Sequence, residues 1–242
     1  MQAHETVNAS PAASRPANTA LGVIEAWLGP IAGRSLLDVG CGRGALARAL
    51  LARGARVSGI DPSAEAIHEA RAAVPEAEFV DAGAEALPFA DDSFDAAILL
   101  NSFHHVPAPL MPGALAEALR VSRGPVLVIE PLAAGAFFEA MRPVEDESVI
   151  RAAAQAAIAR HVAEGRAVVG RALDYDEVRH FSGVDAFLAK IVAVDPARAE
   201  AARRLRPEVE ALVARLGVRE REGLRLDQPH RAILLMPPAT GS

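Results

Sequence analysis

A run of glycines, Gly40-Cys41-Gly42-Arg43-Gly44, follows the short apolar stretch 35–39 and precedes a helical pattern at 45–53. Glycines let the backbone approach a ligand closely and adopt positive φ angles. The start of a helix offers unpaired N–H groups and a partial positive charge. The segment therefore predicts a site for an anionic or polar group of a cofactor.

An acidic residue, Asp61, ends the second apolar stretch at 56–60, about 20 residues after the glycines. An acid at this point can accept hydrogen bonds from both hydroxyls of a ribose. The glycine loop and Asp61 together predict a cofactor that contains adenosine. They do not decide which one, because Gly40-x-Gly42-x-x-Ala45 also fits the loose dinucleotide pattern, so NAD stays an alternative.

Two further segments narrow the choice: GAEALPFADDSFD at 83–95 and NSFHHV at 101–106. With Asp38, two residues before the glycines, they resemble the class I S-adenosylmethionine-dependent methyltransferases, specifically the group similar to the ubiquinone-biosynthesis C-methyltransferases. The resemblance is close over about 36–131, and beyond that only a final strand near 229–235 fits it. It implies transfer of a methyl group from S-adenosylmethionine to a small-molecule acceptor, with S-adenosylhomocysteine as the product.

The resemblance also implies roles for individual residues. Gly40 and Gly42 would pack against the methionine part of the cofactor, and Asp38 would approach its amino group directly or through water. Asp61 would hold the ribose, and Pro62 would pack on the adenine. The other cofactor-binding residues would meet the adenine edge through backbone groups (Gly83, Ala84, Glu85) or lie beside the sulfonium (Asn101, Ser102).

The sequence departs from the family pattern at Gly83, where related proteins often carry an aspartate that accepts from the adenine amino group. Asp81 is a candidate substitute, although the alternation of side chains along a strand does not guarantee its reach. The adenine contact is therefore the least determined part of the expected site.

His104 and His105 are the candidate catalytic residues, because an imidazole has a suitable pKa for a general base. Packing and anchoring of the loop are the alternative roles for this pair. A base is needed only when the acceptor must lose a proton, since proximity and orientation can supply about 7–11 kcal/mol by themselves. The scattered histidines elsewhere lack the spacing of metal ligands, so no metal is expected.

Three other features each have a structural and a functional interpretation. The acidic run 145–147 could bind a cationic acceptor or a metal, but it favours a solvated helix start capped by Asp146 or Ser148. Tyr175 could line an acceptor pocket, although a place in a strand at the sheet edge is slightly favoured. Cys41 is interpreted as a small buried filler rather than a reactive thiol.

Alternating apolar and helical patterns predict the elements that position these residues. Strands are expected at 35–39, 56–60, 78–80, 94–100 and 125–130, with helices at 45–53, 64–73 and 112–121 and a first helix capped by Asn18. This alternation is typical of an α/β fold with a doubly wound, mostly parallel sheet. The resemblance implies a Rossmann-like sheet of seven strands in the order 3-2-1-4-5-7-6.

The second half predicts helical insertions before the sheet closes. Helices are expected at 133–141, 149–164, 184–194 and 197–216, a possible strand at 167–181, and a final strand at about 225–236. In this fold class such insertions hold the acceptor, so the lid would span about 132–216. An apolar acceptor pocket is expected from Phe137, Phe138, Met141 and Phe181.

The 242 residues and 51% hydrophobic content favour one methyltransferase domain at 19–242, with its cofactor half at about 19–131, after a flexible tail at 1–18. The net charge of −6 disfavours a nucleic-acid partner, and no apolar stretch is long enough to span a membrane. No secretory signal is visible, so a cytoplasmic location is expected, and the exposed helices suggest a possible homodimer. The alternatives are an NAD-dependent oxidoreductase and a non-catalytic cofactor-binding protein that acts through a partner.

Overall fold

The computed structural model describes residues 15–221 and 223–238, so most of the expected tail at 1–18 lies outside the described residues. The described strands form one sheet in the order β3-β2-β1-β4-β5-β8-β6, with β7 paired to β8. The strands β1 to β5 are mutually parallel, whereas β8 is antiparallel to both β5 and β6. The expected Rossmann-like order is therefore confirmed, with β8 in the place of the seventh strand.

The elements largely follow the predicted ranges. The strands are β1 (Ser35–Val39), β2 (Arg56–Asp61), β3 (Glu78–Asp81), β4 (Ala96–Leu100), β5 (Val126–Pro131), β6 (Val168–Phe181), β7 (Val218–Glu220) and β8 (Gly223–Met236). The α-helices are α1 (Ala20–Leu28), α2 (Ala45–Leu51), α3 (Ala64–Ala73), α4 (Met111–Val121), α5 (Gly135–Met141), α6 (Ser148–Ala163), α7 (Val184–Val194), α8 (Ala199–Arg204) and α9 (Arg206–Leu216). Two 3₁₀ turns, η1 (Phe103–His105) and η2 (Pro196–Arg198), complete the description.

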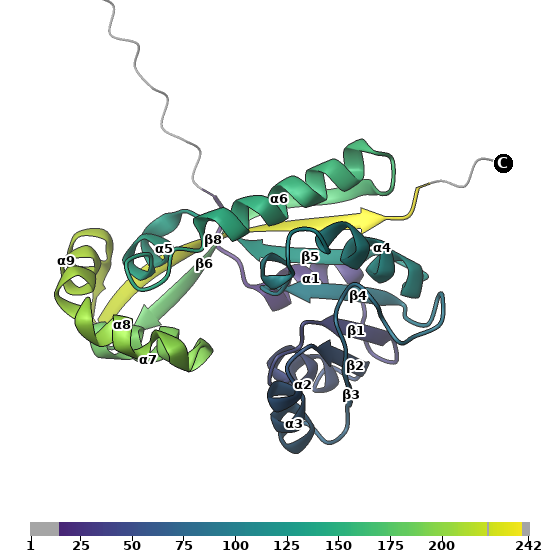
Figure 1. Ribbon diagram of the computed structural model, residues 1–242, viewed down its shortest axis with the longest axis horizontal. Helices are drawn as coiled ribbons and strands as arrows, with labels where there is room; N and C mark the ends of the chain where they lie inside the picture. Colours follow the sequence, from purple (N-terminus) through teal and green to yellow (C-terminus); the bar gives the residue numbers. More distant parts are fainter. Residues whose placement is uncertain (1–14, 222, 239–242) are drawn as a thin grey trace, which may run out of the picture.

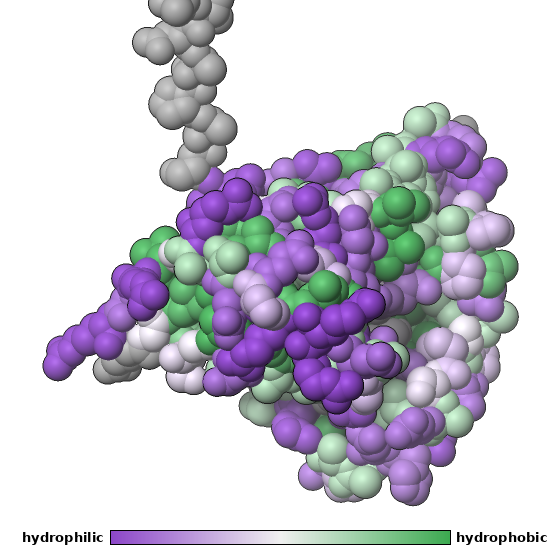
Figure 2. All heavy atoms as spheres, turned by 60° about the vertical axis from the view of Figure 1, so that its left-hand side comes forward, coloured by the Kyte–Doolittle hydropathy of each residue, from purple (hydrophilic) through white to green (hydrophobic). Residues whose placement is uncertain are grey.

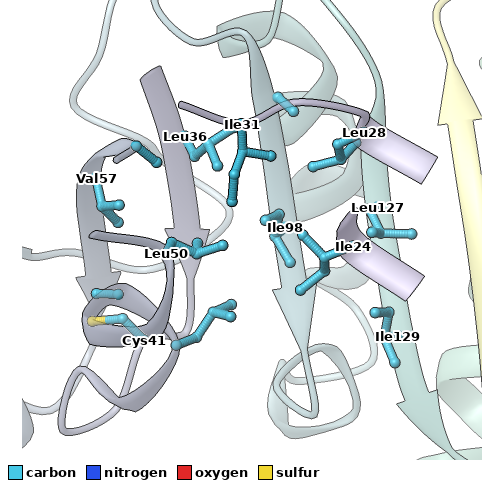
Figure 3. Packing of buried hydrophobic residues seen from close by; sticks show 14 of the residues in the cluster. Ile24, Leu28, Ile31, Leu36, Cys41, Leu50, Val57, Ile98, Leu127 and Ile129 are labelled. Atoms are coloured by element: carbon cyan, nitrogen blue, oxygen red, sulfur yellow. The ribbon is translucent and has the colours of Figure 1, made fainter. Parts of the chain in front are cut away.

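Helices cover both faces of the sheet. Adjacent residues of β1 point to opposite sides, so Leu36 packs with α1, α2 and α3, and Leu37 packs with α4 and α6. Figure 3 shows the first of these layers, with Ile24 and Leu28 of α1 lying against Leu127 of β5. Burial on both faces explains why the central strands are almost continuously apolar.

The strands β6 and β8 are 14 residues long and carry a second group of helices at their far end. Figure 1 shows α5, α7, α8 and α9 gathered there, away from α2 and α3. These four helices and the strand ends beneath them, called the lobe below, share a core of their own around Phe138, Phe187 and Leu226. The predicted insertion of helices into the second half is thus correct.

Four details of the prediction are wrong. The expected helix 197–216 breaks near Leu205, because Pro207 begins a new helix and cannot continue the preceding one. The short strand β7 was not anticipated, and β8 begins slightly earlier than expected. The cap of α1 is Thr19, whose hydroxyl accepts from the N–H of Gly22 at 3.0 Å, so Asn18 is not the cap.

The surface around the lobe mixes polar and apolar side chains. Figure 2 shows this face with hydrophobic groups scattered among hydrophilic ones. Among the described helices, none is both long and apolar enough to cross a lipid bilayer.

Candidate functional site

A large cavity of about 940 Å³ opens at the carboxyl ends of β1, β2 and β4. The strand order reverses between β1 and β4, which is where open α/β sheets bind ligands. Nine of the ten predicted cofactor-binding residues line it: Gly40, Gly42, Asp61, Pro62, Gly83, Ala84, Glu85, Asn101 and Ser102. The tenth, Asp38, lies beneath the glycine loop and does not line the cavity.

The glycine loop needs its glycines for two different reasons. Gly40 and Gly42 both have positive φ angles, of 77° and 50°. A Cβ on Gly40 would lie 2.4 Å from the Cβ of Ser102, so that glycine permits the close approach of the two loops. A Cβ on Gly42 would meet nothing within 4 Å, so its backbone faces open space in the large cavity.

Asp61 joins the loop to the next helix. Its Oδ2 accepts from the N–H of Gly42, and its Oδ1 accepts from the N–H of Ser63, each at 2.9 Å. The hydroxyl of Ser63 in turn caps α3 by accepting from the N–H of Ala66. A carboxylate has about four lone-pair sites, so Asp61 can still accept from a ligand in the cavity.

Asp38 is a buried acid without a complete set of partners. It is 2% exposed, and its Oδ2 atom has no hydrogen-bond partner in the part of the chain that the structure describes. Burial, followed by repulsion from Asp61, raises the pKa of Asp38 to about 7, and the backbone of Ala47 in α2 offsets part of this rise. A cationic group close to the loop would satisfy this atom, so the site fits the ammonium of an amino-acid moiety.

The adenine end differs from the expectation for Asp81. That residue ends the edge strand β3, is exposed and does not line the large cavity. Glu85 does line it, and a Cβ on Gly83 would lie only 2.6 Å from both Glu85 carboxylate oxygens. Glu85 therefore brings a carboxylate to the place where an acidic side chain at position 83 would begin.

Asn101 and Ser102 follow β4 at the junction of two cavities. Asn101 has a φ of 53°, which is uncommon for a residue other than glycine and is often found at functional sites. Its N–H donates to the carbonyl of Ile129, and the Ser102 hydroxyl donates to the carbonyl of Val39 at 2.6 Å. These bonds hold the segment between the ends of β1 and β5.

A small cavity of about 180 Å³ adjoins the large one and lies partly under the lobe. The two cavities share Asn101, His105, Lys190 and Val194. The apolar part of its lining consists of Pro131, Phe137, Met141, Ile191 and Val194. Of the four residues expected around an acceptor pocket, Phe137 and Met141 line this cavity, whereas Phe138 and Phe181 do not.

The two candidate catalytic histidines occupy different environments. His104 is buried and lines only the small cavity, and its Nδ1 contacts Glu130 Oε2. His105 is exposed and lines both cavities, with its ring centroid 4.0 Å from that of His104. Although the residue as a whole is exposed, protein atoms surround part of its ring. This desolvation, followed by the neighbouring His104, lowers the pKa of His105. Glu130 was missed, although an acid at the end of the apolar strand β5 is an unusual signal.

The acidic run before α6 is not the solvated helix start that was expected. Glu147 is 4% exposed and accepts from Arg151 at 2.6 Å and from Arg198 at 3.0 Å. Burial opposes its ionisation, but Arg151, His104 and Arg198 together hold the pKa of Glu147 below its usual range. The N-cap of α6 is Glu147, so neither Asp146 nor Ser148 caps the helix as predicted, although the exposed Asp146 accepts from the N–H of Ser148 at 2.9 Å.

Glu147, His104 and His105 could together hold a metal ion, because their potential ligand atoms lie within 4.8 Å of one another. The sequence did not predict this cluster. Two buried guanidinium groups already neutralise Glu147, which weakens its attraction for a further cation.

Cys41 and Tyr175 have structural surroundings. Cys41 is buried, and its burial, followed by the charges of Asp38 and Asp61, raises the pKa of the thiol. Tyr175 is fully buried in β6, stacks on His230 with ring centroids 5.5 Å apart, and lines neither the large nor the small cavity. The interpretation of Tyr175 as a pocket residue is therefore not supported.

Comparison with known proteins shows which family resembles the part of the chain that supplies most of the lining of the large cavity. Residues 36–124 match a family described as a methyltransferase domain. An uncharacterized methyltransferase from Mycobacterium marinum is 44% identical over 114 residues, and one from Mycobacterium tuberculosis is 40% identical over 119 residues. Residues 36–124 are therefore similar to methyltransferase domains.

The matched segment spans 44% of the M. marinum protein and 46% of the M. tuberculosis protein, so the chain spans less than half the length of these relatives. The family match at 36–124 contains Asp38, the glycine loop, Asp61 and the two histidines. The lobe lies outside these residues. Neither relative points to the ubiquinone-biosynthesis group, so that narrower resemblance stays a prediction.

Solved structures show that the methyltransferase fold extends through the lobe. The YcgJ protein from Bacillus subtilis has a TM-score of 0.58 at 21% identity, over 89% of this chain and 95% of that one. A geranyl diphosphate C-methyltransferase from Streptomyces coelicolor A3(2) has a TM-score of 0.53 at 16% identity, over 88% and 78% of the two chains. The [4+2]-cyclase SpnF also reaches 0.53 at 20% identity, over 86% and 77%, so the fold alone does not decide the reaction.

Proposed function

We propose that this protein transfers the methyl group of S-adenosylmethionine to a small-molecule acceptor. The observation that carries the proposal is the large cavity, which is lined by the glycine loop, Asp61 and the segment after β4 inside a methyltransferase domain. When bound, the cofactor supplies a methyl group on a sulfonium, which is already a good leaving group.

The residues of the chain would hold and orient the reactants. Gly42 leaves room beside the loop, Asp61 accepts from the ribose, and the unpartnered oxygen of Asp38 attracts the ammonium group, directly or through water. Glu85 is placed to accept from the adenine amino group in the role first considered for Asp81. The small cavity would hold the acceptor next to Asn101, and alignment of the two reactants would supply much of the rate enhancement.

The two alternative functions, an NAD-dependent oxidoreductase and a non-catalytic cofactor-binding protein, receive less support. A dinucleotide would bring its negatively charged pyrophosphate to the glycine loop, which begins two residues after the buried acid Asp38, and an ionised Asp38 would repel it. A non-catalytic role has no specific observation in its favour, because the cavity and its polar residues are complete. The cytoplasmic location, the absence of a nucleic-acid partner and the homodimer stay predictions.

Calorimetric titration with S-adenosylhomocysteine tests the cofactor assignment, with NAD as the control ligand. We expect micromolar binding of the first and none of the second. Asp61→Asn should weaken binding about 10- to 100-fold, because hydrogen bonds to charged groups contribute about 1.5–3 kcal/mol. Asp81→Asn is the matched control, since Asp81 lies opposite Asp61 in the sheet register but outside the cavity.

Each outcome of the titration has a definite meaning. Binding of NAD instead of S-adenosylhomocysteine would replace the methyltransferase proposal with the oxidoreductase alternative. Full affinity in Asp61→Asn would remove the ribose role of Asp61. After binding is established, release of S-adenosylhomocysteine from S-adenosylmethionine across a panel of small hydroxy, amino and thiol compounds would identify the acceptor.

A further inference from the structure

His104 is held by a buried carboxylate on one side. Glu130 is 1% exposed, and its Oε1 accepts from the N–H groups of Ser102 and Phe103 at 3.1 and 2.9 Å. Its Oε2 accepts from the N–H of His104 at 3.2 Å and also contacts the Nδ1 of the same residue. A carboxylate only accepts, so this arrangement places the imidazole hydrogen on Nδ1 of His104.

The other ring nitrogen of His104 has no hydrogen-bond partner among residues 15–221 and 223–238. Its Nε2 lies 3.9 Å from Glu147 Oε2, which is too far for a hydrogen bond. That same oxygen already accepts two hydrogen bonds from Arg151. In the neutral form of His104 with its hydrogen on Nδ1, Nε2 presents a lone pair, and the residue lines the small cavity.

A second acceptor without a partner borders the same cavity. Gln228 is 1% exposed, and its Nε2 donates to the carbonyls of Leu132 and Pro229. Its Oε1 atom is buried and has no partner. An unpaired buried acceptor destabilises the free protein, so a molecule that donates a hydrogen bond here would be favoured.

The size and charge of the small cavity restrict its occupant. A cavity of about 150 Å³ already admits a benzene ring, and this one measures about 180 Å³. The charged groups around His104 and the small cavity are Glu130 of β5, Glu147 and Arg151 at the start of α6, Arg179 of β6, Lys190 of α7 and Arg198 of η2, with His105 beside them. The arginines are paired with acids, and Lys190 is exposed and makes no ion pair with the described residues. The two acceptor atoms are therefore the groups that a neutral hydrogen-bond donor in this cavity would satisfy.

We propose that His104 is the general base of this site, that Glu130 is its positioning residue, and that the acceptor is a compact, ring-sized molecule methylated on a hydroxyl oxygen. This inference rests on the proposed function. As the acceptor oxygen forms its bond to the methyl carbon, its O–H bond breaks and the proton passes to Nε2. The electron pair of the broken carbon–sulfur bond stays on sulfur, giving S-adenosylhomocysteine.

The tautomer of His104 tests this inference without a known acceptor. Histidine-labelled protein saturated with S-adenosylhomocysteine would be followed by ¹⁵N NMR between pH 6.5 and 9. We expect an N–H at Nδ1 and an unprotonated Nε2 at pH 8. Glu130→Gln should abolish this fixed tautomer, whereas His105→Gln, which leaves both His104 and Glu130 in place, should not.

Phenol and toluene then probe the cavity as a matched pair that differs in the hydroxyl. Phenol should shift the Nε2 resonance of His104, and toluene should leave it unchanged. The inference is overturned if His104 carries its hydrogen on Nε2, if it stays doubly protonated up to pH 9, or if the two probes act alike. Loss of the Nε2 signal on adding equimolar Zn²⁺ would also overturn it, in favour of a cation site with His105 and Glu147.

Failure of this inference is distinguishable from failure of the proposed function. A protein that does not bind S-adenosylhomocysteine contradicts the function itself. A protein that binds it but shows another His104 tautomer contradicts only the general base. With an acceptor found by the panel, His104→Asn should lower kcat far more than KM.

Discussion

Among single residues, Asp38 shows most directly that a side chain suited to binding a ligand can lower the stability of the free protein. Its carboxyl is fully buried, has an unpartnered oxygen and lies close to a second acid, Asp61. These surroundings penalise the charged form, which is the form that a cationic ligand needs. Asp38 therefore lowers the stability of the free protein and favours the binding of a positively charged group.

The raised pKa of Asp38, about 7 against an ordinary value near 3.8, makes stability depend on pH. Between these two values the folded protein binds more protons than the unfolded chain, so the free energy of unfolding falls as pH rises. Asp38→Asn should thus stabilise the free protein at pH 8 by up to about 4 kcal/mol and have little effect near pH 4. Urea unfolding at both pH values measures this difference.

The same substitution should weaken binding of S-adenosylhomocysteine, because the neutral amide no longer attracts the ammonium. In the wild-type protein, affinity should fall as pH drops below about 7, with proton release on binding visible by calorimetry in buffers of different ionisation enthalpy. An affinity that is independent of pH between 5.5 and 8 would contradict the role of Asp38.

Two glycines form a matched pair that separates backbone strain from ligand contact. Gly42 and Gly33 both have positive φ angles, and a Cβ on either would meet nothing within 4 Å. Alanine at either position should cost about 1–2 kcal/mol of stability through the left-handed backbone. Only Gly42→Ala should also lose affinity for S-adenosylhomocysteine in calorimetry, because Gly33 lies outside the large cavity.

Between elements, a buried ion-pair cluster ties the start of α6 to the lobe. Glu147 forms ion pairs with Arg151 in α6 and with Arg198 in η2, and all three residues are buried. Burying charges is costly unless they are paired, so the cluster is stable only when complete. It also forms one wall of the small cavity, so it fixes the shape of the proposed acceptor site.

Glu147→Gln should destabilise the protein by about 3–5 kcal/mol, because it leaves the buried Arg151 without its ion-pair partner and Arg198 with only the partly exposed Glu145. Glu210→Gln is the control, since the Glu210–Arg206 pair on α9 is more than 40% exposed and should contribute less than about 1 kcal/mol. Urea unfolding compares the two variants. Equally small losses would show that the cluster adds little to stability.

Across the whole molecule, the large cavity joins two parts of the chain that are far apart in sequence. Its floor comes from the ends of β1, β2 and β4, and one side comes from Lys190, Ala193 and Val194 of α7 in the lobe. A ligand in this cavity would contact both parts. Binding should therefore order the end of α7 as well as the glycine loop.

Hydrogen exchange with and without S-adenosylhomocysteine tests this coupling. Amides in the last turn of α7 and in the loop at 40–44 should exchange more slowly in the complex. Amides of α9, which does not line the cavity, serve as the internal control and should be unchanged. Protection of the loop without any change in α7 would restrict the site to the sheet.

The sequence by itself determined the parallel core and the cofactor half of the site, because the signals there are local. A glycine run between a strand and a helix can bind a ligand only where strands end, and the positions of Asp61 and Asn101 at later strand ends bring them to the same edge. The alternation of apolar strands with helices likewise favoured an α/β fold with a mostly parallel sheet. Nine of the ten residues that the family resemblance implied for cofactor binding line one cavity.

Only the tertiary structure decided which side chains meet across elements. Glu130 and His104 are 26 residues apart, Glu147 and Arg198 are 51 apart, and Gln228 approaches Leu132 from the last strand. No local pattern marks such pairs, because their contacts arise from how β5, α6 and the lobe pack together. The same packing turned the acidic run before α6 into a buried cluster and placed Glu85, not Asp81, over Gly83.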